Sequence, residues 1–222
     1  MFKECYSLTS LDLSNFKTLN LKRMDDIFLS CSKLKSINLS GFKGNNVSSL
    51  YEIFKECSSL ISLDLSNFNT ENVTTMKNMF NGCSSLVSIN LSSFNTSKVQ
   101  TMEGLFSGCS SLNSLNILNF NTQNVVNLDS MFNGCPSLTS IDLSNFIFNN
   151  PINFVNQMFY GCSKLKYIDI SNFTFPLYSN PLLFDDSIPS EGTIIVINET
   201  IGNKIKEKIE NWTIIYRNNT IQ

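Results

Sequence analysis

The sequence predicts an α/β repeat fold, a solenoid of about seven 26-residue strand-turn-helix units that ends in a C-terminal capping unit. The first observation is the spacing of the seven cysteines, which is 26 residues five times and 27 residues once. The second is that a leucine follows each cysteine by three residues and a phenylalanine follows it by eleven. A period kept by three columns of residues indicates stacked copies of one structural unit. The cysteine column is Cys5, Cys31, Cys57, Cys83, Cys109, Cys135 and Cys162.

Each copy contains two kinds of apolar pattern. The stretch LVSINLSSF has the L-x-x-L-x-L spacing of a leucine-rich repeat, and its alternation of apolar and polar residues predicts a short strand. Residues 96–108 then carry apolar side chains three or four positions apart, which predicts a short helix. Thr96 is its expected N-cap, and Gly108 is expected to end it. The sequence therefore favours a leucine-rich repeat solenoid.

One such unit is too small to fold alone. Burying its large apolar side chains would contribute about 12–24 kcal/mol, whereas ordering its backbone and side chains costs on the order of 40 kcal/mol. Neighbouring units must therefore complete the burial, and the last unit needs a cover. We assign residues 1–174 to the solenoid and residues 175–222 to a C-terminal cap made of a strand, a helix and a strand.

The cysteine column is best explained as a ladder of buried thiols. Seven is an odd number, so complete internal disulfide pairing is excluded, and no close C-x-x-C pair points to zinc. Free cysteine is among the most buried residue types and packs as a small apolar side chain. The regular spacing of the cysteines is then the period of the solenoid itself.

The composition argues against several classes of function. The net charge is −2, so bulk charge would not recruit nucleic acid, and no apolar segment is long enough to span a membrane. Histidine is absent, and no hydrolase motif occurs, so a hydrolase is the least favoured alternative. No cofactor or resident metal is expected. Calcium between Asp142 and Asp169 is disfavoured, because two carboxylates are too few for its usual oxygen shell.

The best candidates for function are polar side chains that point outward from the strands. They form one serine column and one Asn/Asp column, which would lie on the concave face of a leucine-rich solenoid as a strip roughly 30 Å long. Such a strip suits an extended protein or glycan, although polar ladders that only solvate a sheet are the alternative. Two large side chains interrupt the strip and suggest anchors for a partner. The candidate residues are Asp64, Ser88, Asn90, Ser114, Asn116, Leu118, Asp142, Tyr167 and Asp169.

The repeated stretch MFNGCSSLVSINLSSFNT and its copies resemble the BspA-type leucine-rich repeat surface proteins. The resemblance covers about residues 2–173, and the tail TIIVINETIGNKIKEKIENW also resembles the ending of that family. It implies a secreted or cell-surface protein that adheres to host proteins or other cells and has no catalytic residues. An intracellular interaction scaffold of the same fold, located in the cytoplasm, is the alternative.

The chain begins within a repeat, because Met1 and Phe2 fall just before Cys5. The first residues carry no export signal of the kind that the resemblance implies. We therefore expect either that the natural protein continues upstream or that the first unit is a degenerate copy of the repeat.

Overall fold

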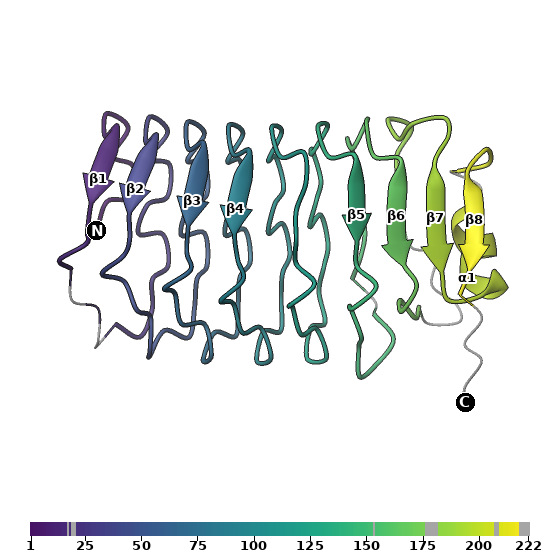
Figure 1. Cartoon of the computed structure of the whole chain (residues 1–222), viewed down its shortest axis with the longest axis horizontal. Coiled ribbons are helices and arrows are strands. Elements are labelled where there is room, and N and C mark those ends of the chain that lie inside the picture. Colours follow the sequence, from purple (N-terminus) through teal and green to yellow (C-terminus); the bar gives the residue numbers. More distant parts are fainter. Residues whose placement is uncertain (17, 19–20, 153, 176–181, 207–208, 218–222) are drawn as a thin grey trace.

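The computed structural model describes residues 1–16, 18, 21–152, 154–175, 182–206 and 209–217. It confirms a solenoid of about seven coils with a period near 26 residues, stacked along one axis (Figure 1). We number the coils one to seven, each beginning at its cysteine. Equivalent residues of successive coils therefore lie side by side, although they are 26 or 27 positions apart in the chain.

One side of every coil runs through a parallel sheet. Strand pairs are in register, so Ser62 lies beside Ser88 and Leu63 beside Ile89. Residues 114–116 of coil five are described but are not in a strand, which divides the ladder into β1-β2, β3-β4 and a four-stranded sheet. The repeat strands are β1 Ser10–Asp12, β2 Ser36–Asn38, β3 Ser62–Asp64, β4 Ser88–Asn90, β5 Ser140–Asp142 and β6 Tyr167–Ile170.

The helix expected in each repeat is wrong for the described residues, where the equivalent segments are runs of turns. Two residues of each segment, five and one before the cysteine, have a positive φ, which an α-helix does not accommodate. Gly104 and Gly108 hold these places in coil four. In the other coils, the position five residues before the cysteine is occupied by Asp26, Glu52, Asn78, Ser130 and Gln157.

The backbone of these turns bonds to the next coil instead of to itself. The Asp26 and Phe28 amides donate to the Tyr51 and Ile53 carbonyls, both at 3.0 Å. Thr96, the expected N-cap, is buried, and its hydroxyl donates to the Asn121 carbonyl at 2.8 Å. Hydrogen bonds between neighbouring coils therefore stabilise the segment, as they do in a sheet, although its apolar residues have the spacing of a helix.

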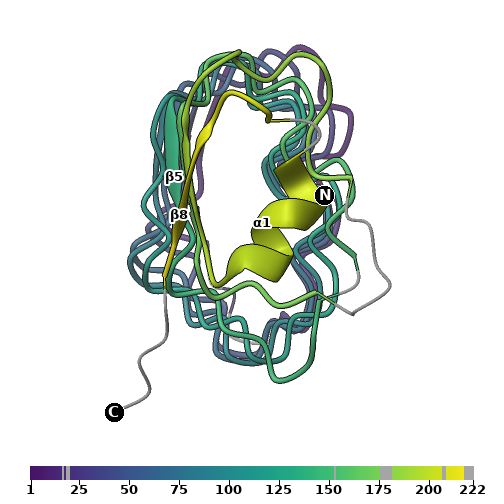
Figure 2. The ribbon, with the colours of Figure 1, turned by 90° about the vertical axis from the view of Figure 1, so that its right-hand side faces the viewer.

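This difference also removes the expected concave face. Bridges such as Ser49–Thr75 stack the turn side of the coils just as the strands stack the other side. Helices wider than strands would spread one side of the solenoid and bend it, but here both sides stack alike. The coils run in a straight row and superimpose closely when viewed along the stack (Figures 1 and 2).

The interior is filled by columns of identical side chains. The phenylalanines three positions before each cysteine form a stack of parallel rings whose centroids are 5.3 to 5.9 Å apart. Offset stacking of this kind adds about 0.5–1.5 kcal/mol per pair to the burial of the rings. The column runs through Phe2, Phe28, Phe54, Phe80, Phe106, Phe132, Phe159 and Phe184.

The cysteines form the predicted ladder of free thiols. Each thiol from Cys31 onward is buried and donates to the carbonyl of the phenylalanine 29 or 30 residues earlier in the chain, as Cys57 Sγ does to the Phe28 carbonyl at 3.1 Å. Burial raises the pKa of the Cys57 and Cys162 thiols to about 12. The protonated thiol that can donate this hydrogen bond is therefore the form that the fold favours. The other donors are Cys31, Cys83, Cys109, Cys135 and Cys162.

The C-terminal segment continues the sheet and covers its end. Strand β7 (Thr193–Val196) pairs with β6, and β8 (Thr213–Tyr216) pairs with β7. Helix α1 (Glu199–Ile205) is capped by Asn198, which accepts from the Ile201 amide, and lies across the interior from the strands (Figure 2). The apolar stripe predicted for this segment is buried. Trp212 packs beside Phe184, with their ring centroids 6.3 Å apart. The stripe is Ile201, Ile205, Ile209 and Trp212.

We expect the buried thiols to react slowly with iodoacetamide in the folded protein and rapidly in denaturant, because burial suppresses the reactive thiolate. Cys5 is only partly buried and should react first. Mass spectrometry of the alkylated protein checks this order. Native disulfides, or early labelling of Cys83 or Cys109, would contradict the ladder.

Replacing Ser130 by glycine tests the left-handed backbone conformation found five residues before each cysteine from Cys31 onward. Ser130 has a φ of 57°, and Gly104 occupies the same place in the preceding coil. Ser130→Gly should raise the free energy of unfolding by about 0.5 kcal/mol, since relief of the left-handed strain exceeds the entropic cost of glycine. Ser107→Gly is the matched control, because Ser107 is not in the left-handed region, and should be destabilising. Urea denaturation measures both, and destabilisation by Ser130→Gly would contradict the turn structure.

Removing residues 175–222 should make the chain aggregate. The deletion takes away β7 and α1 and exposes the edge of β6 and the buried apolar residues of coil seven, including Ile168 and Phe173. Size-exclusion chromatography and thermal melting check the result. A truncated chain that stays monomeric and melts at the original temperature would show that the segment is not a cap.

Candidate binding surface

The outward serine column is an exposed strip along the sheet. Ser88 and Ser114 are exposed, and their equivalents in the other coils up to Ser140 are exposed too. Tyr167 occupies the same column in coil seven, where its side chain is 37% exposed. Register pairing places Tyr167 directly beside Ser140. The strip therefore ends in one large aromatic side chain next to small hydroxyls.

The Asn/Asp column has a structural task that the sequence analysis did not foresee. In every coil its Oδ1 atom accepts a hydrogen bond from the backbone amide two residues later, at 2.8 to 3.2 Å. These Asx turns end each strand and start the following turn. The Ser66 amide also holds the pKa of the Asp64 carboxyl below its usual range. The acceptors are Asp12, Asn38, Asp64, Asn90, Asn116, Asp142 and Asp169.

Asp142 and Asp169 are register neighbours, as expected, but they differ in exposure. Asp142 is exposed, whereas Asp169 is only 6% exposed. Burial, together with both carboxylates, raises the pKa of Tyr167. No cluster of three or more Cys, Asp or Glu side chains able to hold a metal occurs in the described part of the chain.

Shallow hollows lie where neighbouring strands end. One is lined by Asn90, Ser92, Asn116, Leu118 and Asn119. The structure thus brings three predicted residues, Asn90, Asn116 and Leu118, to one place. Leu118 is not on the strand itself but in the turn that follows it.

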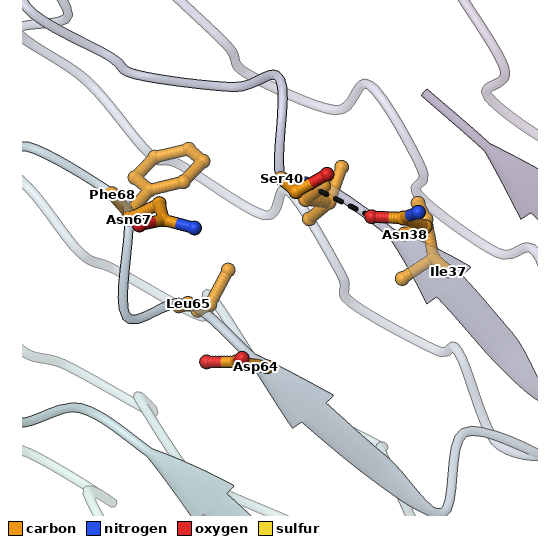
Figure 3. A pocket seen from close by; sticks show the side chains of 8 residues that line it. Ile37, Asn38, Ser40, Asp64, Leu65, Asn67 and Phe68 are labelled. Atoms are coloured by element: carbon orange, nitrogen blue, oxygen red, sulfur yellow. Dashed lines mark hydrogen bonds between the residues drawn. The ribbon is translucent and has the colours of Figure 1, made fainter. Parts of the chain in front are cut away.

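A similar hollow between coils two and three shows how these sites are built (Figure 3). Asn38 bonds to the Ser40 amide at one side, and Asp64 and Asn67 line the other. A column of amide side chains adds a second connection that sequence reasoning missed. Asn119 Nδ2, for example, donates to the Leu91 and Phe94 carbonyls of the preceding coil at 3.0 and 3.1 Å. The signal was present in the sequence as the recurring dipeptide Asn-Phe.

Gly41 takes the place of this asparagine in coil two. A Cβ atom there would lie 2.3 Å from the Ser14 carbonyl oxygen, because the two coils approach closely at this corner. Coils one and two are therefore too close at this corner for the side chain that asparagine supplies in other coils.

The charged side chains lie mainly away from the strand face. Glu52 is nearly buried in a left-handed turn, and Lys55 and Asn78 donate to its carboxylate at 2.9 and 3.0 Å. These hydrogen bonds lower the pKa of Glu52, although burial alone would raise it. Lys77 pairs with Glu103 at 2.9 Å. These groups stabilise the turn side, whereas the charges of the Asn/Asp column on the strand face are the carboxylates Asp12, Asp64, Asp142 and Asp169.

No helix that the structure describes has both the length and the apolar character needed to span a membrane. Comparison with known proteins identifies one family, described as "Mycoplasma protein of unknown function, DUF285". It matches residues 1–89 and again residues 86–177. No curated protein and no solved structure matches the chain. Because the two matches together span most of its length, the chain belongs to the DUF285 family of Mycoplasma proteins of unknown function.

Proposed function

We propose that the protein is a non-enzymatic binding and adhesion module that holds a protein or glycan partner along its strand face. The observation that carries the proposal is the continuous, exposed column of hydroxyl side chains that ends at Tyr167. Extended surfaces of this kind are the usual binding sites of solenoid proteins. The rigid stacking of the coils fixes the spacing of these side chains before a partner arrives, which lowers the entropic cost of binding.

The proposal also covers the cellular location of the protein and its relationship to the leucine-rich repeat proteins. The repeated F-x-x-C-x-x-L-x-x-I-x-L motif resembles the BspA-type leucine-rich repeat proteins, and on that basis we place the module at the cell surface or outside the cell. The absence of histidine from the sequence supports a binding role over a hydrolytic one. The turn segments would make this chain a leucine-rich repeat variant without helices.

Within the strip, the serine column and Tyr167 are the better contacts for a partner. The Asn/Asp residues already use one oxygen in an Asx turn, so changing them would damage the coil as well as the surface. Ser88, by contrast, is exposed and lies at the centre of the strip. Tyr167 offers a ring and a hydroxyl, the combination enriched at interface hot spots.

Ser88→Arg and Tyr167→Ser should each weaken binding by about tenfold or more, because the first blocks the strip and the second removes its anchor. Binding would be measured on an array of extracellular-matrix proteins and glycans displayed on a chip. Circular dichroism would verify that the variants remain folded.

The controls are Lys98→Ala and Glu103→Ala, which change charged side chains that make polar contacts with neighbouring coils outside the strand face. They should leave binding unchanged. If they abolish binding while the strand-face variants retain it, the strand face is not the binding site.

A further inference from the structure

Four columns that are polar in most coils become apolar in coils five and six. Leu118 stands where coils one to four have serine, and Phe154 stands in the ladder occupied elsewhere by Ser49, Thr75 and Thr101. Val126 replaces polar residues such as Thr74 and Gln100, and Ile147 replaces residues such as Asn95 and Asn121. We call these four residues, Leu118, Val126, Ile147 and Phe154, the apolar rim.

The rim is exposed and continuous. Its residues are 50%, 59%, 53% and 51% exposed, in sequence order, and exposed apolar side chains that gather in one place mark interaction sites. Leu118 and Ile147 line one hollow, and Val126 and Phe154 line the next. Gln123 lines both hollows and so joins them.

The backbone under the rim is firmly held. The Thr122 hydroxyl donates to the Ile147 carbonyl at 3.0 Å, and the Leu128 amide donates to the Phe154 carbonyl at 2.7 Å. The exposed apolar side chains therefore stand on connected, hydrogen-bonded coils rather than on a loose loop.

Amide side chains surround the rim, and charges are nearly absent from this part of the chain. Asn121, Gln123 and Asn149 are exposed around the two hollows. Between residues 104 and 163 the only Asp, Glu, Lys or Arg residues are Asp129 and Asp142. The carboxylates near Phe154, Asp129 and Glu103, already accept hydrogen bonds from the Asn156 amide and from Asn127. A ligand of this surface is therefore selected mainly by hydrogen bonds to amide side chains and by apolar contact.

We propose that the apolar rim binds a neutral oligosaccharide. A sugar ring presents C–H faces, which fit the Phe154 ring and the aliphatic side chains, and hydroxyl groups that both donate and accept. Amide side chains also do both, so each can pair with a sugar hydroxyl without leaving a group unsatisfied. An acidic glycan would find no Lys or Arg between residues 104 and 163 to pair with its charge.

The surface is less suited to a protein partner. Protein hot spots are enriched in Trp, Tyr and Arg and gather around a buried centre. The rim contains none of these residue types, and its four apolar side chains are distributed over two adjacent shallow hollows that share Gln123. This spacing instead resembles successive subsites for the units of an extended chain. The rim shares Leu118 with the strand-face candidates, but Val126, Ile147 and Phe154 lie outside them. Variants of these three residues therefore test the rim independently of Ser88 and Tyr167.

The test uses the full chain and a set of hexasaccharides, namely cellohexaose, maltohexaose, N-acetylchitohexaose and, as an acidic probe, a heparin hexasaccharide. Calorimetry should detect binding of at least one neutral hexasaccharide, equally strong at low and high salt. Phe154→Thr, Val126→Thr and Ile147→Thr each install the kind of polar residue found at the same place in another coil. Loss of an apolar contact should weaken binding about tenfold in each.

Val87→Thr is the matched control. Val87 is 41% exposed but lies outside the rim, and threonine occupies the equivalent place at Thr9 and Thr139. This variant and Ser88→Arg should bind the hexasaccharide normally. The proposal is overturned if no neutral hexasaccharide binds, if only the heparin fragment binds, or if the three rim variants bind as well as Val87→Thr. It is also overturned if ultracentrifugation shows that the rim instead joins two copies of the chain.

Discussion

Every feature of the molecule depends on hydrogen bonds that run from one coil to the next. A single coil has neither a helix nor a paired strand of its own, so its backbone polar groups are satisfied mainly by its neighbours. Side chains repeat the same connection: Cys57 to Phe28, Thr96 to Asn121, and Asn119 to Leu91. Stacking the coils in register is thus the condition for burying the core and also for satisfying the backbone.

This condition explains which predictions succeeded. Spacing alone identified the solenoid, the short strands and the thiol ladder, because each is a direct consequence of a repeated column. The buried stripe that includes Ile201 and Trp212 was also readable, although α1 holds only its first two residues, Ile201 and Ile205, and ends before Ile209 and Trp212. The solenoid period is the strongest signal in the sequence, and it is confirmed by the register of the repeat strand pairs β1–β2, β3–β4 and β5–β6.

The repeat helix was wrong for a physical reason. Apolar residues three or four apart face one side of a helix, but they also face inward at successive corners of a coil made of turns. The evidence against a helix lay in the residues between them, where Gly104 and Gly108 stand four apart and Gly82 and Gly134 repeat the second position. The Asx turns were hidden for a similar reason, because an outward Asn on a strand and an Asn that caps a turn have the same place in the sequence. The exposed residues Ile147 and Phe154 were visible only as departures from columns whose path the structure later defined.

The identity of adjacent coils has a consequence for the evolution of the chain. Wherever one coil meets the next, donors and acceptors occur in the same order, as the ladder from Ser49 through Thr75 to Thr101 shows. A recombination event between two repeats that gains or loses one whole period would leave every junction chemically intact. The surface features would then move apart or together by a fixed step, and the terminal cover of β7, α1 and β8 would need no redesign. Length in such a molecule is a variable that genetic exchange can adjust without disturbing the fold.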